Sequence, residues 1–282
     1  MIPTLLLCAA ALAAPELASE VAPEVAPAVP DAASLVAAWA AVAPQVQAEA
    51  RIPLDLDAQD LARVAQGDIA RHREHMDGVD RVLGIAWSAQ PREALWVAII
   101  DDACDTLVDG LVERHLPAEL PGQKILFQHV ALPWPLANRQ WIIDIRNSAR
   151  LYTDTAGAAW ERTWTLADHQ EQRRTAVPGE GMPEAEAVWT PLNQGGWLLV
   201  DAGPGSLVVY HARADVGGAV PDDLATRLAL ATLKGMLRHV LDRAALEPAH
   251  YGPDHAPIQR PDGSPIPGWQ PTAVRDLEPR QP

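Results

Sequence analysis

The amino-acid sequence predicts an α+β fold, in which a curved antiparallel sheet packs around one long helix late in the chain. Strand-like segments recur between residues 68 and 213, helical segments are interposed among them, and a long amphipathic helix begins at Asp222. The chain has 282 residues, of which 48% are hydrophobic, so it is long enough to bury a sizeable core. Ten of its 14 aromatic residues are tryptophans, which suit half-polar pockets.

Residues 1–14 have the pattern of a secretory signal peptide. A short apolar run ends at the small-residue site Ala11-Leu12-Ala13 and is too short to span a bilayer as a mature helix. We therefore expect an exported protein, periplasmic or extracellular. Cys8 offers a lipidation site as an alternative, although Leu7 stands where such a site needs a small residue. After cleavage only Cys104 remains, which excludes an internal disulfide and favours a buried, inert thiol.

The elements are expected in the following order. Residues 15–30, rich in Ala, Pro, Val and Glu, form an extended linker, and one domain occupies residues 31–246. Helices are predicted over residues 31–42, with Asp31 as a cap, over 58–66 and over 91–112. Strands are predicted over residues 72–76, 81–88, 124–132, 140–151, 158–166, 188–191, 197–201 and 207–213.

The helix that begins at Asp222 follows a Gly-Gly loop. Pro221 fits a first helical turn, which does not need its missing N–H, and the acidic side chains of Asp222 and Asp223 favour the positive helix end. Apolar residues recur on one face of this helix: Leu224, Leu228, Ala231, Leu237, Val240, Leu241 and Ala244. Residues 247–282 are rich in proline, which predicts an extended tail that wraps the surface or is disordered.

Strand parity predicts a lined interior, because alternate residues of a strand face opposite sides of the sheet. One parity carries polar residues that we expect to face solvent: Gln140, Asp144, Arg146, Glu161, Thr163, Thr165, His211 and Arg213. The other parity points inward: Arg139, Trp141, Ile143, Ile145, Trp160, Arg162, Trp164, Leu166, Val208, Tyr210 and Ala212. Arginines among these apolar side chains favour a cavity with polar anchors. The alternative is that Arg139 and Arg162 lie near strand ends and reach water.

Charge and motifs exclude other classes of protein. A formal net charge of −15 argues against nucleic-acid binding, which needs a basic face. His72 and His75 are three residues apart in a predicted strand, so their imidazoles diverge and we expect no metal site. The motifs of serine hydrolases, phosphate-binding loops and zinc metalloproteases are absent from the sequence, and no cofactor is expected.

Two motifs resemble START lipid-transfer domains over roughly residues 60–246. The segment from Pro133 to Ile142 resembles the family's Pro-x-x-x-Arg-Asp-aromatic-aliphatic signature, and the segment from Gly196 to Pro221 resembles its last hairpin and following Asp-x-Gly-Gly-x-aliphatic-Pro loop. The resemblance implies a helix-grip fold with a hydrophobic tunnel for one lipid, closed by the last helix. It also implies that Arg139 is the signature arginine. The lid hinge would consist of Asp215, Gly217, Gly218 and Pro221.

The chain departs from the family at two positions. Gln140 stands where the family usually has an acidic residue, and Ile145 occupies the position of a second cavity arginine in sterol-binding members. Recognition of a sterol hydroxyl through that position is therefore not expected, although Arg162 is a substitute. At the hinge, Gly217 and Gly218 permit the positive φ that a strand-to-helix turn requires.

The leading hypothesis is a non-enzymatic protein that binds a lipid or other hydrophobic small molecule for transport or sensing. We expect transient contact with a membrane surface, no nucleic-acid partner and a monomer. Two alternatives stay open: a cyclase or aromatase-like enzyme, with Arg162 or Tyr210 in acid-base roles, and a protein-binding scaffold with a filled core. The predicted ligand-binding residues are Arg139, Trp141, Ile143, Trp160, Arg162, Trp164, Val208, Tyr210 and Leu228.

Overall fold

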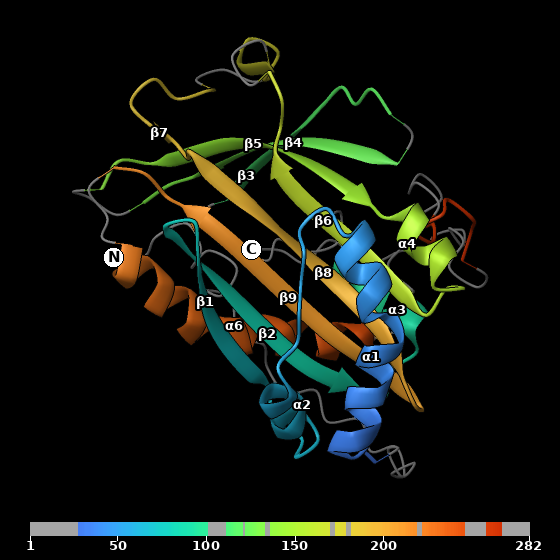
Figure 1. The fold of residues 1–282 in the computed structure, drawn as a ribbon. Helices are drawn as coiled ribbons and strands as arrows, with labels where there is room; N and C mark the ends of the chain where they lie inside the picture. Colours follow the sequence, from blue (N-terminus) through green and yellow to red (C-terminus); the bar gives the residue numbers. More distant parts are fainter. Residues whose placement is uncertain are drawn as a thin grey trace, which may run out of the picture.

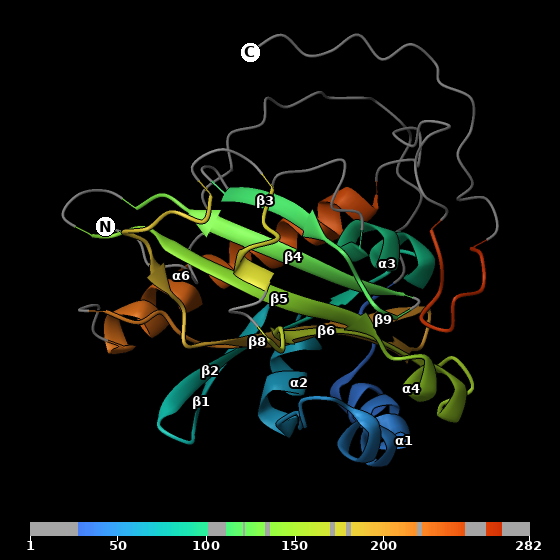
Figure 2. The ribbon, with the colours of Figure 1, turned by 90° about the horizontal axis from the view of Figure 1, so that it is seen from above.

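The computed structural model confirms the α+β class, with one curved sheet and helices on both of its faces (Figures 1 and 2). It describes residues 28–100, 111–120, 122–132, 136–169, 173–178, 182–218, 222–245 and 258–266. The predicted signal peptide, most of the predicted linker and most of the predicted tail lie outside these ranges. No helix of the described part is long and apolar enough to cross a membrane.

Nine strands form the sheet in the order β1-β2-β9-β8-β6-β5-β4-β3. All neighbours in this order are antiparallel, and the short β7 pairs in parallel with β5. The strands are β1 Ala70–Met76, β2 Val79–Ser88, β3 Leu111–Leu116, β4 Gln123–Val130, β5 Arg139–Asn147, β6 Ala159–Leu166, β7 Val188–Trp189, β8 Leu192–Ala202 and β9 Gly205–Asp215. The helices are α1 Ala32–Glu49, α2 Ala58–Val64, α3 Arg92–Ile100, α4 Ala149–Asp154 and α6 Asp222–Ala244.

Helix α6 lies within the concave side of the sheet, as Figure 2 shows. It packs against β1, β2 and α3. Gly84 of β2 permits this approach, because a Cβ there would lie 2.6 Å from Leu237 and 2.9 Å from Leu233 of the helix. Ala231, which we expected on the apolar face of α6, is exposed. It lies six residues before Leu237, a rotation of about 240° at 3.6 residues per turn, so it cannot share that face.

The opposite face of the sheet is covered as well, which corrects one expectation. None of the polar residues expected to face solvent is exposed; Glu161 is 3% accessible and His211 1%. Helices α1 and α2 pack their apolar residues against β2, β8 and β9 on this side. Parity correctly separated the two faces of each strand, but it cannot tell whether a polar face meets water or another element.

Several predicted boundaries are wrong, and β3 and α4 were not predicted. Helix α1 extends to Glu49 rather than to residue 42, and β8 begins at Leu192 rather than at residue 197. The helix predicted over 91–112 ends at Ile100 in the described part, and Leu111 already pairs with Val130 across β3 and β4. Residues 101–110, which include Cys104, lie outside the described residues. The strand predicted to reach Leu151 ends at Asn147, because Ser148 caps α4 by accepting a hydrogen bond from the Leu151 N–H.

The described part of the tail packs against the core. Ile258 and Ile266 are buried in the same apolar cluster as α3 and α6. The indole N–H of Trp96 in α3 donates to the carbonyl of Gln259 at 2.9 Å. Residues 258–266 therefore cover the α3 end of the concave side.

Candidate ligand-binding site

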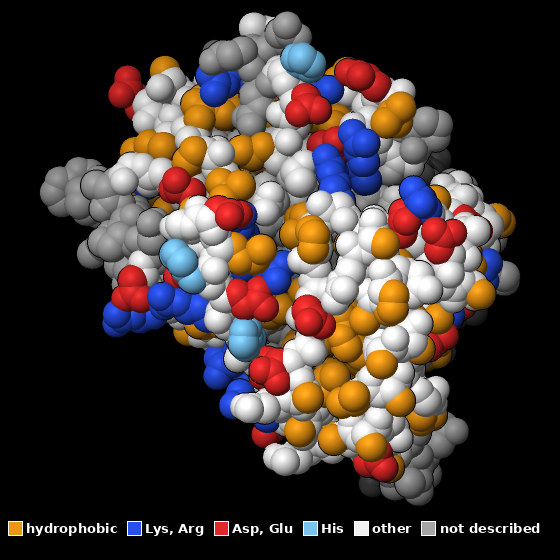
Figure 3. Space-filling view, viewed as in Figure 1, with side chains coloured by type: hydrophobic (Ala, Val, Ile, Leu, Met, Phe, Trp, Pro, Cys, Tyr) orange, Lys and Arg blue, Asp and Glu red, His pale blue; other side chains and the backbone are white. Residues whose placement is uncertain are grey.

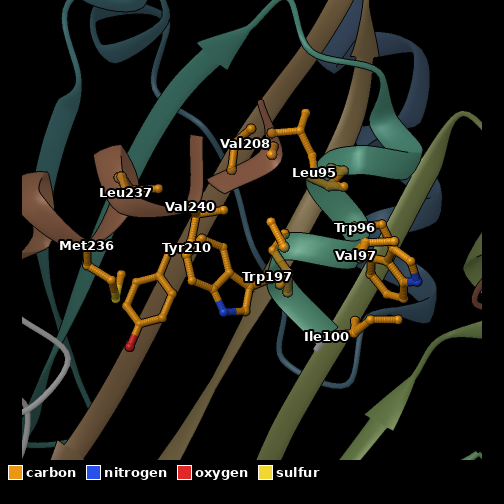
Figure 4. Packing of buried hydrophobic residues seen from close by; sticks show 14 of the residues in the cluster. Leu95, Trp96, Val97, Ile100, Trp197, Val208, Tyr210, Met236, Leu237 and Val240 are labelled. Carbon is orange, nitrogen blue, oxygen red and sulfur yellow. The ribbon is translucent and has the colours of Figure 1, made fainter. Parts of the chain in front are cut away.

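Aromatic side chains from β6, β8 and β9 line the concave side beneath α6. Trp197 and Tyr210 are opposite each other in the β8–β9 register, with ring centroids 4.8 Å apart, and Trp164 lies 5.8 Å from Tyr210. In Figure 4 the Tyr210 hydroxyl and the Trp197 indole nitrogen point away from Leu237 and Val240 of α6. The helix thus covers the apolar edges of these rings and leaves their polar groups directed toward the rest of the interior.

The apolar lining continues beyond this aromatic group. Trp160 and Val208 belong to the cluster under α3 and α6, whereas Trp141 and Ile143 belong to a second buried cluster on β3–β5. Trp164 packs against both clusters, with its indole over the backbone of Gly195, where there is no side chain. The apolar residues predicted to face inward therefore form one continuous surface across the concave face.

Arg139 does not extend into this surface. The residue is 2% accessible, and its guanidinium donates to the carbonyls of Val216 at 2.7 Å and Gly217 at 3.0 Å, and also to that of Ala137. Burial lowers the pKa of Arg139 below its ordinary value. The Arg139 side chain therefore holds the loop before α6, and its role in ligand binding stays a prediction.

The predicted hinge has the expected backbone. Gly217 and Gly218 have φ values of +65° and +71°, which confirms the requirement for glycine, and the Asp215 carboxylate accepts the Gly217 N–H at 2.8 Å. A Cβ on Gly218 would lie 3.2 Å from the Arg139 guanidinium. Pro221 lies outside the described residues, and although Leu228 is part of α6, its side chain is not described.

Cationic side chains gather at the C-terminal end of α3. Arg162 is buried on the concave side and donates to the Ile100 carbonyl at 3.5 Å, and Lys124 of β4 donates to the same carbonyl at 3.5 Å. A carbonyl oxygen carries partial negative charge, so the Ile100 carbonyl stabilises both cations. The prediction that Arg162 is a polar group of the interior agrees with this position.

A polar group on β3, β4 and β5 was missed. The indole N–H of Trp141 donates to Gln128 at 2.6 Å, and the Gln128 amide donates to the Glu113 carboxylate. Glu113 and Trp141 both pair with Gln128 in the strand registers. Parity applied to residues 124–132 would have placed Lys124 and Gln128 on the inward face, but the link to Glu113 required the β3 register.

Two residues on the covered convex face, outside this site, have strongly shifted pKa values. Burial raises the pKa of Glu161 to about 8, while burial and the nearby Arg81 charge lower that of His211 to about 3.

The two histidines of β1 each lie beside a carboxylate. His72 lies 3.3 Å from Asp60, and His75 lies 2.9 Å from Asp80. No cluster of three or more potential metal ligands occurs among the described residues.

Structural comparison finds similarity to START lipid-transfer domains. The STAR-related lipid transfer protein from Xanthomonas axonopodis (fragment 25–204) is 20% identical with a TM-score of 0.48, covering 64% of this chain and 96% of that one. Human STARD10 is 13% identical with a TM-score of 0.46, covering 68% and 81%. The Zhui aromatase/cyclase from Streptomyces is 14% identical with a TM-score of 0.34, covering 59% and 91%.

These sequence identities and TM-scores are too low to assign a ligand or an activity to this protein from the similar structures. No family model and no curated protein sequence matches the chain. The sheet order, the position of α6 and the lined concave face define the class on their own: an α+β helix-grip protein with a Trp-rich interior.

Proposed function

We propose that this protein binds one lipid or similar amphiphile between the concave face of the sheet and α6. The observation that carries the proposal is the distribution of polarity on that face. Apolar and aromatic side chains line β2, β4, β5, β6, β8 and β9. The polar side chains of Glu113, Gln128, Lys124 and Arg162 lie among them, toward β3, β4 and the last described residue of α3. An apolar surface with polar groups at one end fits a molecule with an apolar body and a polar head.

Burial of the apolar body would supply most of the affinity, at about 25 cal/mol for each Å² of ligand surface removed from water. The polar groups would orient the head. Entry requires α6 to move, and the loop of Asp215, Gly217 and Gly218 is the segment whose backbone would change.

We further propose that the protein works as an exported monomer, in a periplasm or outside the cell, and contacts a membrane surface transiently to exchange its ligand. The support is the signal-peptide pattern of residues 1–14. N-terminal sequencing of the protein from a secreted or periplasmic fraction tests it. A mature protein that retains Met1 in the cytoplasm would contradict export.

The binding experiment is lipid extraction from the purified protein, with mass spectrometry of the extract, followed by titration of the emptied protein with a fluorescent lipid. We expect about one lipid per chain. A protein that purifies empty and takes up no lipid would support the alternative of a filled scaffold.

Ile143 and Ile142 provide a matched pair of variants. They are neighbours on β5, both buried, but Ile143 belongs to the concave cluster and Ile142 to the cluster on the opposite face. Each substitution by Trp adds similar volume and costs about 1–3 kcal/mol of stability. We expect Ile143→Trp to lower lipid uptake by the folded protein at least fivefold, and Ile142→Trp to leave it unchanged. Equal uptake by the two variants would contradict a concave ligand site.

A further inference from the structure

A groove lies on the outer side of α6, away from the concave interior. It has a volume of about 560 Å³, within the range of small-molecule sites, and runs between α6, the start of β1 and the end of α2. Its lining residues are Arg63, Asp68, Ile69, Ala70, Arg71, Arg227, Leu230, Ala231 and Lys234. A smaller hollow of about 200 Å³ shares Asp68, Ile69 and Lys234 and adds Trp87, Arg238 and Leu241.

The charge of this groove is opposite to that of the chain. Five cations line the groove and the adjoining hollow against one carboxylate, that of Asp68, in a protein whose formal net charge is −15. Arg227, Lys234 and Arg238 are spaced seven and four residues apart, so they form a stripe along one side of α6. In Figure 3, Lys and Arg side chains gather along the lower left edge, where Figure 1 places α6, β1 and α2.

Part of this charge is not neutralised locally. Arg63 lies 3.6 Å from Asp60, and Arg227 pairs with Asp223. Arg71 donates to the Leu230 carbonyl at 2.8 Å, which ties β1 to α6 but leaves its charge unpaired by that contact. Within the described ranges, neither Lys234 nor Arg238 belongs to an ion pair. The groove therefore presents positive potential to a ligand.

Apolar side chains also line the groove. Ile69 and Leu230 lie beside the cations, and the adjoining hollow is closed by Trp87, whose indole N–H is held by the Ala202 carbonyl at 3.1 Å. A fixed aromatic wall and aliphatic side chains beside guanidinium groups suit a molecule that joins an anion to an apolar chain.

We propose that this groove binds the anionic head group of an amphiphile, a phosphate or carboxylate, with the first part of its apolar chain on Ile69, Leu230 and Trp87. The site is separate from the concave interior, so it does not depend on the proposal that the interior binds a lipid. The amphiphile is either a free molecule or part of a membrane surface, and both sources present the same chemistry to the groove.

Two arms of one experiment distinguish these sources. In the first arm, the protein is titrated calorimetrically with monomeric dihexanoyl-phosphatidylglycerol and, separately, with its phosphatidylcholine analogue. In the second arm, co-sedimentation measures binding of the protein to vesicles of phosphatidylglycerol and phosphatidylcholine and to vesicles of pure phosphatidylcholine. In at least one arm we expect the protein to bind the anionic lipid more tightly than phosphatidylcholine, and we expect added salt to weaken this binding. Binding of the monomeric lipid would identify a free molecule as the source of the amphiphile, and binding of vesicles alone would identify a membrane surface. Either result supports the proposal that the groove binds an anionic head group.

Three variants with equal change in charge locate the contact. Lys234→Glu and Arg238→Glu should each reduce affinity for the anionic probe at least fivefold. Arg150→Glu, on an exposed side chain of α4, should not. Circular dichroism verifies folding, and uptake of lipid by the interior serves as a second readout that the two groove variants leave unchanged. Equal binding of both head groups, or equal losses in all three variants, would overturn the proposal.

Discussion

Replacement of Arg139 by Met separates a loop-holding role from a ligand-binding role. The change keeps the aliphatic stem and removes the donors to the Val216 and Gly217 carbonyls, which lie at 2.7 and 3.0 Å. A buried carbonyl without a donor costs about 1–3 kcal/mol. Removal of a buried charge, whose burial already lowers the Arg139 pKa, offsets part of this cost. We expect a net loss of about 2–3 kcal/mol.

Urea denaturation and thermal melting measure this loss, which corresponds to a fall in Tm of about 4–12 °C. Hydrogen exchange should increase at the amides of residues 215–218, because the loop loses its anchor. Arg150→Met is the control: that side chain is exposed and its pairs with Glu49 and Asp154 contribute about 0–1 kcal/mol. A variant that keeps its stability but loses affinity for lipid would refute the reasoning, because Arg139 would then act on the ligand.

Two further predictions concern stability. Since burial raises the folded pKa of Glu161 to about 8, the folded state retains a proton that the unfolded state releases near pH 4.5, so stability falls as pH rises between these values. Glu161→Gln should remove this decline and stabilise the protein by a few kcal/mol at pH 8. If the free energy of unfolding of the variant depends on pH as that of the wild type does, Glu161 does not cause the decline. Ile266→Ala, at a fully buried position, should cost about 2–4 kcal/mol in urea denaturation, against less than 0.5 for Leu120→Ala at a 52% exposed position. Similar costs at both positions would show that residues 258–266 do not pack on the core.

Much of the fold follows from local pattern. The Asp31 carboxylate accepts the Ser34 N–H at 2.7 Å as the cap of α1, and the paired glycines before α6 adopt positive φ. These features depend on residues close in the chain, where steric and hydrogen-bonding rules act without the rest of the molecule. Two of the boundaries that were wrong lie where a strand partner or a helix cap sets the element's end: Leu111 pairs with Val130, and Ser148 caps α4.

The candidate site was predictable only in part. Alternation along each strand identified the concave tryptophans, but the role of Arg139 depended on a loop 77 residues later in the chain. The link from Glu113 through Gln128 to Trp141 required the register of three strands. Contacts between residues so far apart in the chain leave no periodic pattern in the sequence, so no local rule predicts them.

The sequence by itself therefore determined the class of fold, most of its elements other than β3 and α4, and the two faces of β5, β6 and β9, because these depend on periods of 2 and 3.6 residues. The tertiary structure alone decided which face is covered, what Arg139 holds and where cations of α2, β1 and α6 meet. Each of those outcomes depends on elements distant in the chain, which become neighbours only when the apolar faces of the sheet and helices are buried together.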